Sequence, residues 1–355
     1  MGPVINNGAL ASGALWMAQM ADGDGKSRSG NLLQTWGRLL RVPNLFTVPG
    51  DPIAGFLLAS GGIVSWGMAW AAVVSLCLYA AGLLLNDFFD RDVDARERPE
   101  RPIPSGAARA NTVLAAGLGL LVGGVALGFG LGHPGVGAVA IAVALAIVGY
   151  DAGLKRIPWL GQIVMGSCRA GSVVLGAAFA HAPMAPAVVI AAAVAWAYTT
   201  SLTLVAAGET SERRPGWAAH VPGLVLLAGG IAMLRHSMGK IQWPLMTCVD
   251  WDPCCGGETT WFVDRAGVVA ALLLVLAIGE AEWSAFRVRQ GSLPTPAFIG
   301  RLIRVMITVQ AAWVVWTLGP LLGRGQWEGA AACVVVACLA LRWLAGLTAR
   351  RFYGS

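Results

Sequence analysis

The chain has little charge for its length. Only 12% of its 355 residues are Asp, Glu, Lys or Arg, whereas 56% are hydrophobic and the mean hydropathy is +0.66. A soluble domain is expected to be roughly 25% charged and roughly 45–50% apolar. The shortage of charge therefore excludes a soluble enzyme, a disordered protein and a secreted domain held by disulfides, and it predicts a polytopic membrane protein.

Several familiar sequence signals are also absent. No Lys or Arg precedes Lys26, so the weakly apolar stretch 9–20 lacks the basic region of a secretory signal peptide. The sequence contains no Walker A, dinucleotide-binding, nucleophile-elbow or HExxH motif. We expect residues 1–40 to be a mobile cytoplasmic tail and residues 41–350 to form a single transmembrane domain.

Ten apolar segments have about the 20 residues that a helix needs to cross a bilayer. Because backbone in lipid must satisfy its own hydrogen bonds, these segments predict an all-α bundle of about nine to ten spans. The expected spans lie near residues 45–64, 67–86, 110–130, 134–150, 160–181, 184–206, 218–235, 264–282, 300–320 and 327–348. Several are rich in Gly and Ala, which permit close helix packing in lipid.

Basic residues are distributed unevenly over the loops. With the N-terminus inside, the cytoplasmic segments hold 19 Lys and Arg and the outside loops hold four. This bias follows the positive-inside rule and accounts for the net charge of +6 better than nucleic-acid binding does. We expect a multi-pass protein of a bacterial cytoplasmic membrane, or alternatively of an organelle membrane, with both termini cytoplasmic and no nucleic-acid partner.

The longest outside segment, 236–263, contains Cys248, Cys254 and Cys255. Their spacing lacks the four ligands in paired blocks of a structural zinc site. A disulfide from Cys248 to one of the other two is compatible with the sequence, and so is a surface loop with free thiols.

Three carboxylates at the end of the second expected span form the informative cluster. Asp87, Asp90 and Asp94 are spaced i, i+3 and i+7, so a continuing helix places them on one face, with Asp92 on the other. Mg²⁺ is typically held by one or two carboxylates together with substrate phosphates. Acidic groups at a membrane span are costly and usually functional, which favours a metal site over a solvated helix end.

The motif NDFFDRDVD, continued by ERPERPIPSG, resembles the NDxxDxxxD signature of the UbiA superfamily of intramembrane prenyltransferases. The segment 41–45 is similar to the start of that family's first helix, and 150–156 is similar to its Tyr…Lys-Arg loop. The resemblance implies a helical bundle whose central cavity is open to lipid under a polar cytoplasmic cap. It also implies Mg²⁺-dependent transfer of a prenyl group from an isoprenyl diphosphate to an aromatic or related lipophilic acceptor.

The resemblance assigns roles to individual residues. The expected catalytic residues are Asp87, Asp90, Lys155 and Tyr150. The expected substrate-binding residues are Arg41, Asn44, Asn86, Lys155, Arg156 and Arg169, and the expected Mg²⁺ ligands are Asp87, Asp90, Asp94, Glu209 and Glu212. Arg169 is included because a charge inside a span is usually functional. For Lys155, a salt bridge to Asp151 four residues away is the structural alternative to phosphate binding.

The second acidic motif of the family is not present in its usual form. After the sixth expected span the family has a DxxxD-type pair, whereas this chain has Glu209 and Glu212, which a helix would place on one face. They either hold a second Mg²⁺ or form a polar helix end neutralised by Arg213 and Arg214. The alternative function is therefore a non-catalytic relative that binds or moves a prenylated or other lipophilic metabolite.

Overall fold

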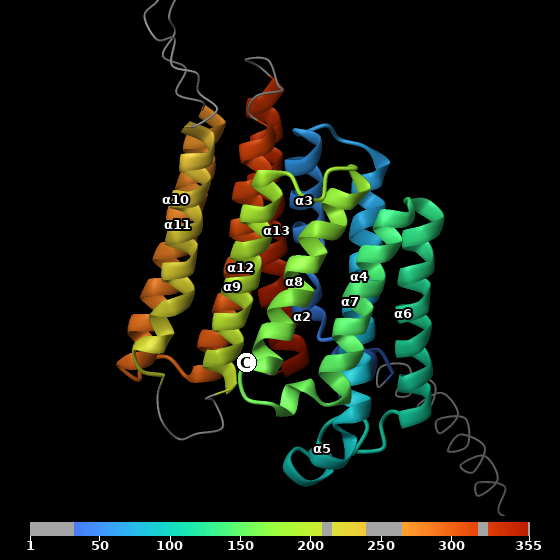
Figure 1. Ribbon diagram of the computed structural model, residues 1–355. Helices are drawn as coiled ribbons and strands as arrows, with labels where there is room; N and C mark the ends of the chain where they lie inside the picture. Colours follow the sequence, from blue (N-terminus) through green and yellow to red (C-terminus); the bar gives the residue numbers. More distant parts are fainter. Residues whose placement is uncertain (1–31, 208–214, 239–264, 319–325, 354–355) are drawn as a thin grey trace, which may run out of the picture.

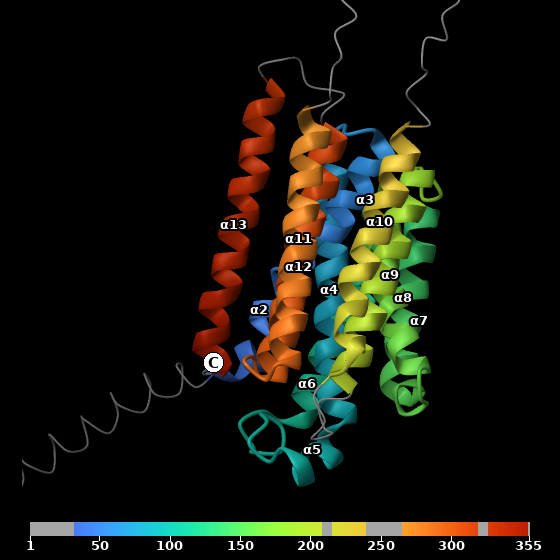
Figure 2. The ribbon, with the colours of Figure 1, turned by 90° about the vertical axis from the view of Figure 1, so that its left-hand side faces the viewer.

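The structure is a computed structural model that describes residues 32–207, 215–238, 265–318 and 326–353. Within these ranges the regular structure is entirely helical, and nine helices are long and apolar enough to cross a membrane. Figures 1 and 2 show these helices standing side by side in one bundle. The expected all-α class is confirmed, and the chain is a multi-pass integral membrane protein.

The nine long helices lie close to the expected spans. They are α4 (Trp66–Phe89), α6 (Ala110–Leu131), α7 (Pro134–Ala152), α8 (Leu160–Phe179), α9 (Pro186–Ala207), α10 (Val221–Met238), α11 (Arg265–Arg289), α12 (Thr295–Leu318) and α13 (Gln326–Tyr353). The largest differences are at the end of α11, expected at 282, the start of α12, expected at 300, and the end of α13, expected at 348. α11 continues past its expected end through Arg287 and Arg289, charged residues that hydropathy alone excludes from a span.

The first expected span, 45–64, is wrong as a single helix. It is divided into α2 (Val42–Leu45) and α3 (Gly50–Ser60), and α3 is too short to cross a membrane alone. The division falls next to Pro49, which has no backbone N–H and so cannot donate the hydrogen bond that a continuous helix requires. α3 then ends at Gly61, which adopts the left-handed conformation that suits glycine at a helix terminus.

A short helix, α5 (Arg91–Glu97), follows α4 almost without interruption, with Asp90 between them. Figure 1 shows α5 beyond one end of the bundle, near the connection from α7 to α8; we call this end the α5 end. The expected continuation of the second span through Asp94 is therefore nearly met, because Asp90 itself has helical backbone angles.

Two glycines allow α3 and α8 to approach closely. A Cβ atom at Gly55 would lie under 3.0 Å from the carbonyl oxygen of Val173, and one at Gly176 would lie under 3.0 Å from that of Pro52. Close backbone contact through small residues is a common basis of helix packing in lipid. This contact positions the polar residues of α8 against the break between α2 and α3.

Some expected features fall outside the described residues. They are most of the tail 1–40, the pair Glu209 and Glu212, and most of the segment 236–263 with Cys248, Cys254 and Cys255.

Candidate active site

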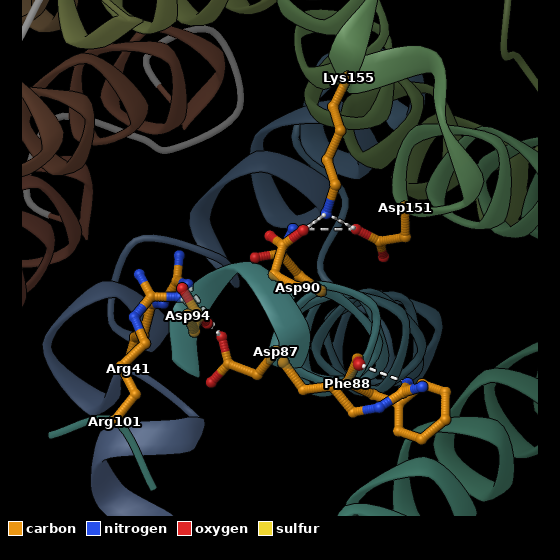
Figure 3. A network of polar contacts seen from close by, with 10 residues as sticks. Arg41, Asp87, Phe88, Asp90, Asp94, Arg101, Asp151 and Lys155 are labelled. Carbon is orange, nitrogen blue, oxygen red and sulfur yellow. Dashed lines mark hydrogen bonds and ion pairs between the residues drawn. The ribbon is translucent and has the colours of Figure 1, made fainter. Parts of the chain in front are cut away.

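Four carboxylates lie near one another at the α5 end of the bundle (Figure 3). Asp87 and Asp90 come from the end of α4, Asp94 from α5, and Asp151 from the end of α7. Asp87, Asp94 and Asp151 are buried. Because a buried carboxylate is costly unless it is paired, the positions of the neighbouring cations are central to this site.

Two arginines neutralise one side of the cluster. Nη1 of Arg101 lies 2.7 Å from Oδ2 of Asp94 and 3.7 Å from Oδ1 of Asp87, and Nη2 of Arg41 lies 3.3 Å from the same Asp87 oxygen. Arg41 was expected at the site. Arg101 was not assigned a role, although it belongs to the ERPERPIPSG segment that carried the family resemblance.

Lys155 lies on the other side of the cluster. Its Nζ is 2.7 Å from Oδ1 of Asp90 and 3.6 Å from Oδ1 of Asp151, while Nδ2 of Asn86 donates to the same Asp151 oxygen at 3.0 Å (Figure 3). The Tyr150 ring centroid is 5.7 Å from this Nζ. The alternative expected for Lys155, a salt bridge to Asp151, is therefore present, but the contact with Asp90 is shorter.

Asp151 is the residue of this cluster that sequence reasoning did not select. It stands directly after Tyr150 in the loop motif and is only 2% exposed. An acidic residue at the end of an apolar span was the available signal, since such residues are usually functional.

A cavity of about 360 Å³ extends from this network into the bundle. That volume lies at the lower end of the roughly 300–1,000 Å³ of small-molecule sites. The predicted residues Arg41, Asn44, Asn86 and Tyr150 line it, as does Asp151. Much of the remaining lining is apolar and comes from α4, α7, α8, α9 and α12, including Leu78, Leu83, Val143, Ile147, Leu202 and Ile303.

Arg169 lines the cavity but is held within the bundle. Its Nε lies 2.5 Å from Oδ2 of Asp51, and its guanidinium also donates to the carbonyl oxygen of Thr47. The side-chain nitrogen of Gln310 donates to that carbonyl at 2.8 Å and to Asp51 at 2.7 Å. Arg169 and Gln310 thus satisfy the Thr47 carbonyl, which the break between α2 and α3 leaves without a helical partner.

The remaining predicted residues lie elsewhere. Arg156 is exposed on the short 3-10 helix Leu154–Arg156 and does not line the cavity. Asp94 pairs with Arg101 and, like Asp87, Asp90 and Lys155, is absent from the cavity lining. Sequence reasoning missed Asp51 and Gln310, whose signal was a polar residue inside an apolar segment.

The donor set at the mouth of the cavity fits a hard cation such as Mg²⁺. Carboxylate and amide oxygens are available from Asp87, Asp90, Asp151 and Asn86, and Mg²⁺ prefers oxygen ligands. The Lys155 ammonium already occupies a cation position between two of these carboxylates. Among the described residues no three His, Cys, Asp or Glu side chains close a metal site by themselves, so substrate oxygens would complete the coordination.

The fold and the site together define a multi-pass membrane protein whose internal cavity suits a ligand with a charged head and an apolar body. The model of the UbiA prenyltransferase family matches residues 52–289, about two thirds of the chain. The chain belongs to the UbiA prenyltransferase family.

Known relatives share part of this chain. Digeranylgeranylglyceryl phosphate synthase of Methanoregula boonei is 36% identical over 128 residues, which cover 36% of this chain and 45% of the relative. The protein of the same name from Natronomonas pharaonis is 31% identical over 159 residues, which cover 45% of this chain and 57% of that relative. The chain thus spans about half the length of the curated relatives that it matches.

A solved structure has the same fold. The apo structure of a UbiA homolog from Aeropyrum pernix K1 superposes with a TM-score of 0.53, covering 77% of this chain and 97% of that one. The sequence identity is 15%, so this likeness concerns the fold alone.

Proposed function

We propose that the chain is a Mg²⁺-dependent prenyltransferase that moves an isoprenyl group from an isoprenyl diphosphate to a lipophilic acceptor. The observation that carries this proposal is the network of carboxylates and cations at the mouth of a largely apolar cavity. An isoprenyl diphosphate has the matching form, with a charged head and a hydrocarbon tail.

The charged residues bind the head group in this proposal. Asp87 and Asp90 would hold Mg²⁺, which when bound supplies the positive charge that makes diphosphate a better leaving group. Arg41, which lines the cavity, and Lys155, which lies beside Asp151 of the lining, donate to the phosphate oxygens because both are cationic. As the ligand binds, Arg41 exchanges Asp87 for phosphate and Lys155 exchanges Asp90 for phosphate.

The apolar cavity supports the second half of the reaction. Loss of diphosphate leaves a positive charge on the prenyl group, and water would react with this cation before the acceptor does. Aliphatic side chains such as Ile147 and Ile303 exclude water from the cavity. The face of Tyr150 at the cavity mouth stabilises a nearby positive charge, as its position beside the Lys155 ammonium illustrates.

The names of the relatives favour one class of acceptor. Both relatives described above are digeranylgeranylglyceryl phosphate synthases, which supports a prenylated glyceryl phosphate in place of the aromatic acceptor expected from the family resemblance. Their similarity covers less than half of this chain, so this acceptor is part of the proposal.

Membrane topology also belongs to the proposal. The bias of 19 basic residues against four supports a cytoplasmic α5 end, with both termini on that side. It also supports the division into a tail 1–40, a transmembrane domain 41–350 and an extracytoplasmic segment 236–263.

The function is tested with purified chain in detergent, geranylgeranyl diphosphate, Mg²⁺ and geranylgeranylglyceryl phosphate. Mass spectrometry should detect the digeranylgeranylated product together with released diphosphate, and EDTA should abolish both. Asp87→Asn should lower the rate by roughly 10²-fold or more, because charge stabilisation at the leaving group is lost. An aromatic acceptor is tried in parallel. Mg²⁺-dependent binding with no product from any acceptor would favour the non-catalytic alternative.

A further inference from the structure

Lys155 is shared between two carboxylates that belong to different helices and differ in accessibility. The side chain of Asp90 is 26% exposed at the end of α4, whereas that of Asp151 is 1% exposed at the end of α7. Figure 3 shows the ammonium between them. Asp90 is therefore the more exposed of the two carboxylates, whereas Asp151 borders the cavity.

Asp151 depends on Lys155 for charge compensation. Its other contact is with Asn86, whose neutral amide donates a hydrogen bond but does not cancel the charge. Within the ranges that the structure describes, Lys155 is the one cation within 4.0 Å of this carboxylate. A buried carboxylate without a cation is strongly unfavourable, so Asp151 favours conformations of Lys155 that keep the ammonium close to it.

The same ammonium obstructs the proposed metal site. It lies 2.7 Å from Oδ1 of Asp90, in a close ion pair. With Mg²⁺ held at Asp90, the Lys155 ammonium would be repelled and would have to leave that carboxylate. The distance to Asp151 is 3.6 Å, and the flexible four-carbon stem of lysine allows it to close.

We propose that Asp151 is a positioning residue that receives the Lys155 ammonium when Asp90 binds Mg²⁺ and diphosphate. Lys155 then remains at the cavity mouth, where it contacts the diphosphate instead of competing with the metal. Asp151 also fixes Asn86 through the same oxygen atom, and so connects the first acidic motif to the loop after α7. This inference rests on the proposed function.

The test measures how much Mg²⁺ is needed for binding, with no turnover involved. Geranylgeranyl diphosphate is titrated calorimetrically into detergent-purified protein at a series of Mg²⁺ concentrations. In Asp151→Asn the side chain keeps its size and its acceptor for Asn86 but loses its charge. Because Lys155 then stays on Asp90, the Mg²⁺ concentration for half-maximal binding should rise about tenfold, within the usual range for coupled sites.

Two further variants separate this role from a structural one. In a Lys155→Met background the competing ammonium is absent, so adding Asp151→Asn should no longer change the Mg²⁺ requirement. The matched control is Asp92→Asn, the same chemical change at a carboxylate that is 76% exposed and pairs with Arg91. It should leave the Mg²⁺ requirement unchanged.

Each result supports or overturns the proposal. An unchanged Mg²⁺ requirement in Asp151→Asn, or an equal rise in the Lys155→Met background, would overturn it while leaving the proposed function intact. If Asp151→Asn does not fold, Mn²⁺ binding to the Lys155→Met variant tests the proposal instead. This substitution should strengthen Mn²⁺ binding without diphosphate, and unchanged or weaker Mn²⁺ binding would refute the competition. Wild-type protein that binds no diphosphate at any Mg²⁺ concentration would remove both proposals.

Discussion

At the scale of single residues, two buried carboxylates of the bundle are paired with arginines from distant parts of the chain. Arg41 reaches Asp87 across 46 positions, and Arg169 reaches Asp51 from another helix. The second pair lies deep in the bundle, where both side chains are buried. Ionisable groups at such a position are retained only with a partner.

The Asp51–Arg169 pair gives a prediction about stability. Arg169→Met leaves the Asp51 carboxylate buried without its cation and should lower the free energy of unfolding by about 3–5 kcal/mol. The double variant Asp51→Leu/Arg169→Met removes both charges and should recover most of the loss. Thermal unfolding in one detergent compares the three proteins. A double variant as unstable as the single one would show that charge compensation is not the cause.

Sequence reasoning identified several residues of the carboxylate network but, apart from the local pair Lys155–Asp151, not their partners. Asn86, Asp87 and Asp90 were recognisable because they lie within one short segment that carries both a helical spacing of carboxylates and a family motif. Asp151 and Gln310 were missed, because their roles arise from contacts with other helices that one sequence does not specify. Arg169 was selected for its charge, but its contact with Asp51 was not foreseen.

At the scale of helices, the close contact of α3 and α8 holds the broken first span against the cavity wall. Positions of the long helices followed from hydropathy, because each needs an apolar surface of membrane length. The break near Pro49 did not follow from hydropathy, which is continuous across it; the proline itself was the available signal, and the groups that stabilise the break come from α8 and α12.

Packing at Gly176 provides a test at this scale. Gly176→Ala introduces a Cβ against the backbone of Pro52 and should lower the free energy of unfolding by about 1–3 kcal/mol through overpacking. Gly119→Ala in α6 is the matched control, because its Cβ meets no atom within 4 Å. Thermal unfolding should show a loss for Gly176→Ala only. Equal effects at the two positions would contradict the proposed packing.

At the scale of the whole molecule, the cavity is built from early and late helices together. α12 contributes Ile299, Ile303 and Met306 to its lining, although the family match ends before α12 begins. Figure 2 shows α13 at the edge of the bundle beside α11 and α12. Nη2 of Arg342 on α13 lies 2.5 Å from Glu280 on α11, so an ion pair attaches this last helix.

Membrane orientation is testable on the same scale. In a cysteine-free background, Ser105→Cys lies at the α5 end and Met184→Cys lies between α8 and α9 at the opposite end; both positions are exposed. In intact cells an impermeant maleimide should label the Met184 site and not the Ser105 site, because the basic loops are retained in the cytoplasm. The reverse pattern would invert the proposed topology.

The central claim is that the carboxylate network binds an isoprenyl diphosphate together with Mg²⁺. The most direct test is calorimetric binding of geranylgeranyl diphosphate to the purified wild type, with and without Mg²⁺. Asp87→Asn/Asp90→Asn and Glu209→Gln/Glu212→Gln are measured alongside. We expect Mg²⁺-dependent binding that is lost in the aspartate double variant, and loss in the glutamate variant as well would make that pair a second metal site. Binding that survives the aspartate double variant, or is absent from the wild type, would show that the carboxylate network is not the diphosphate site.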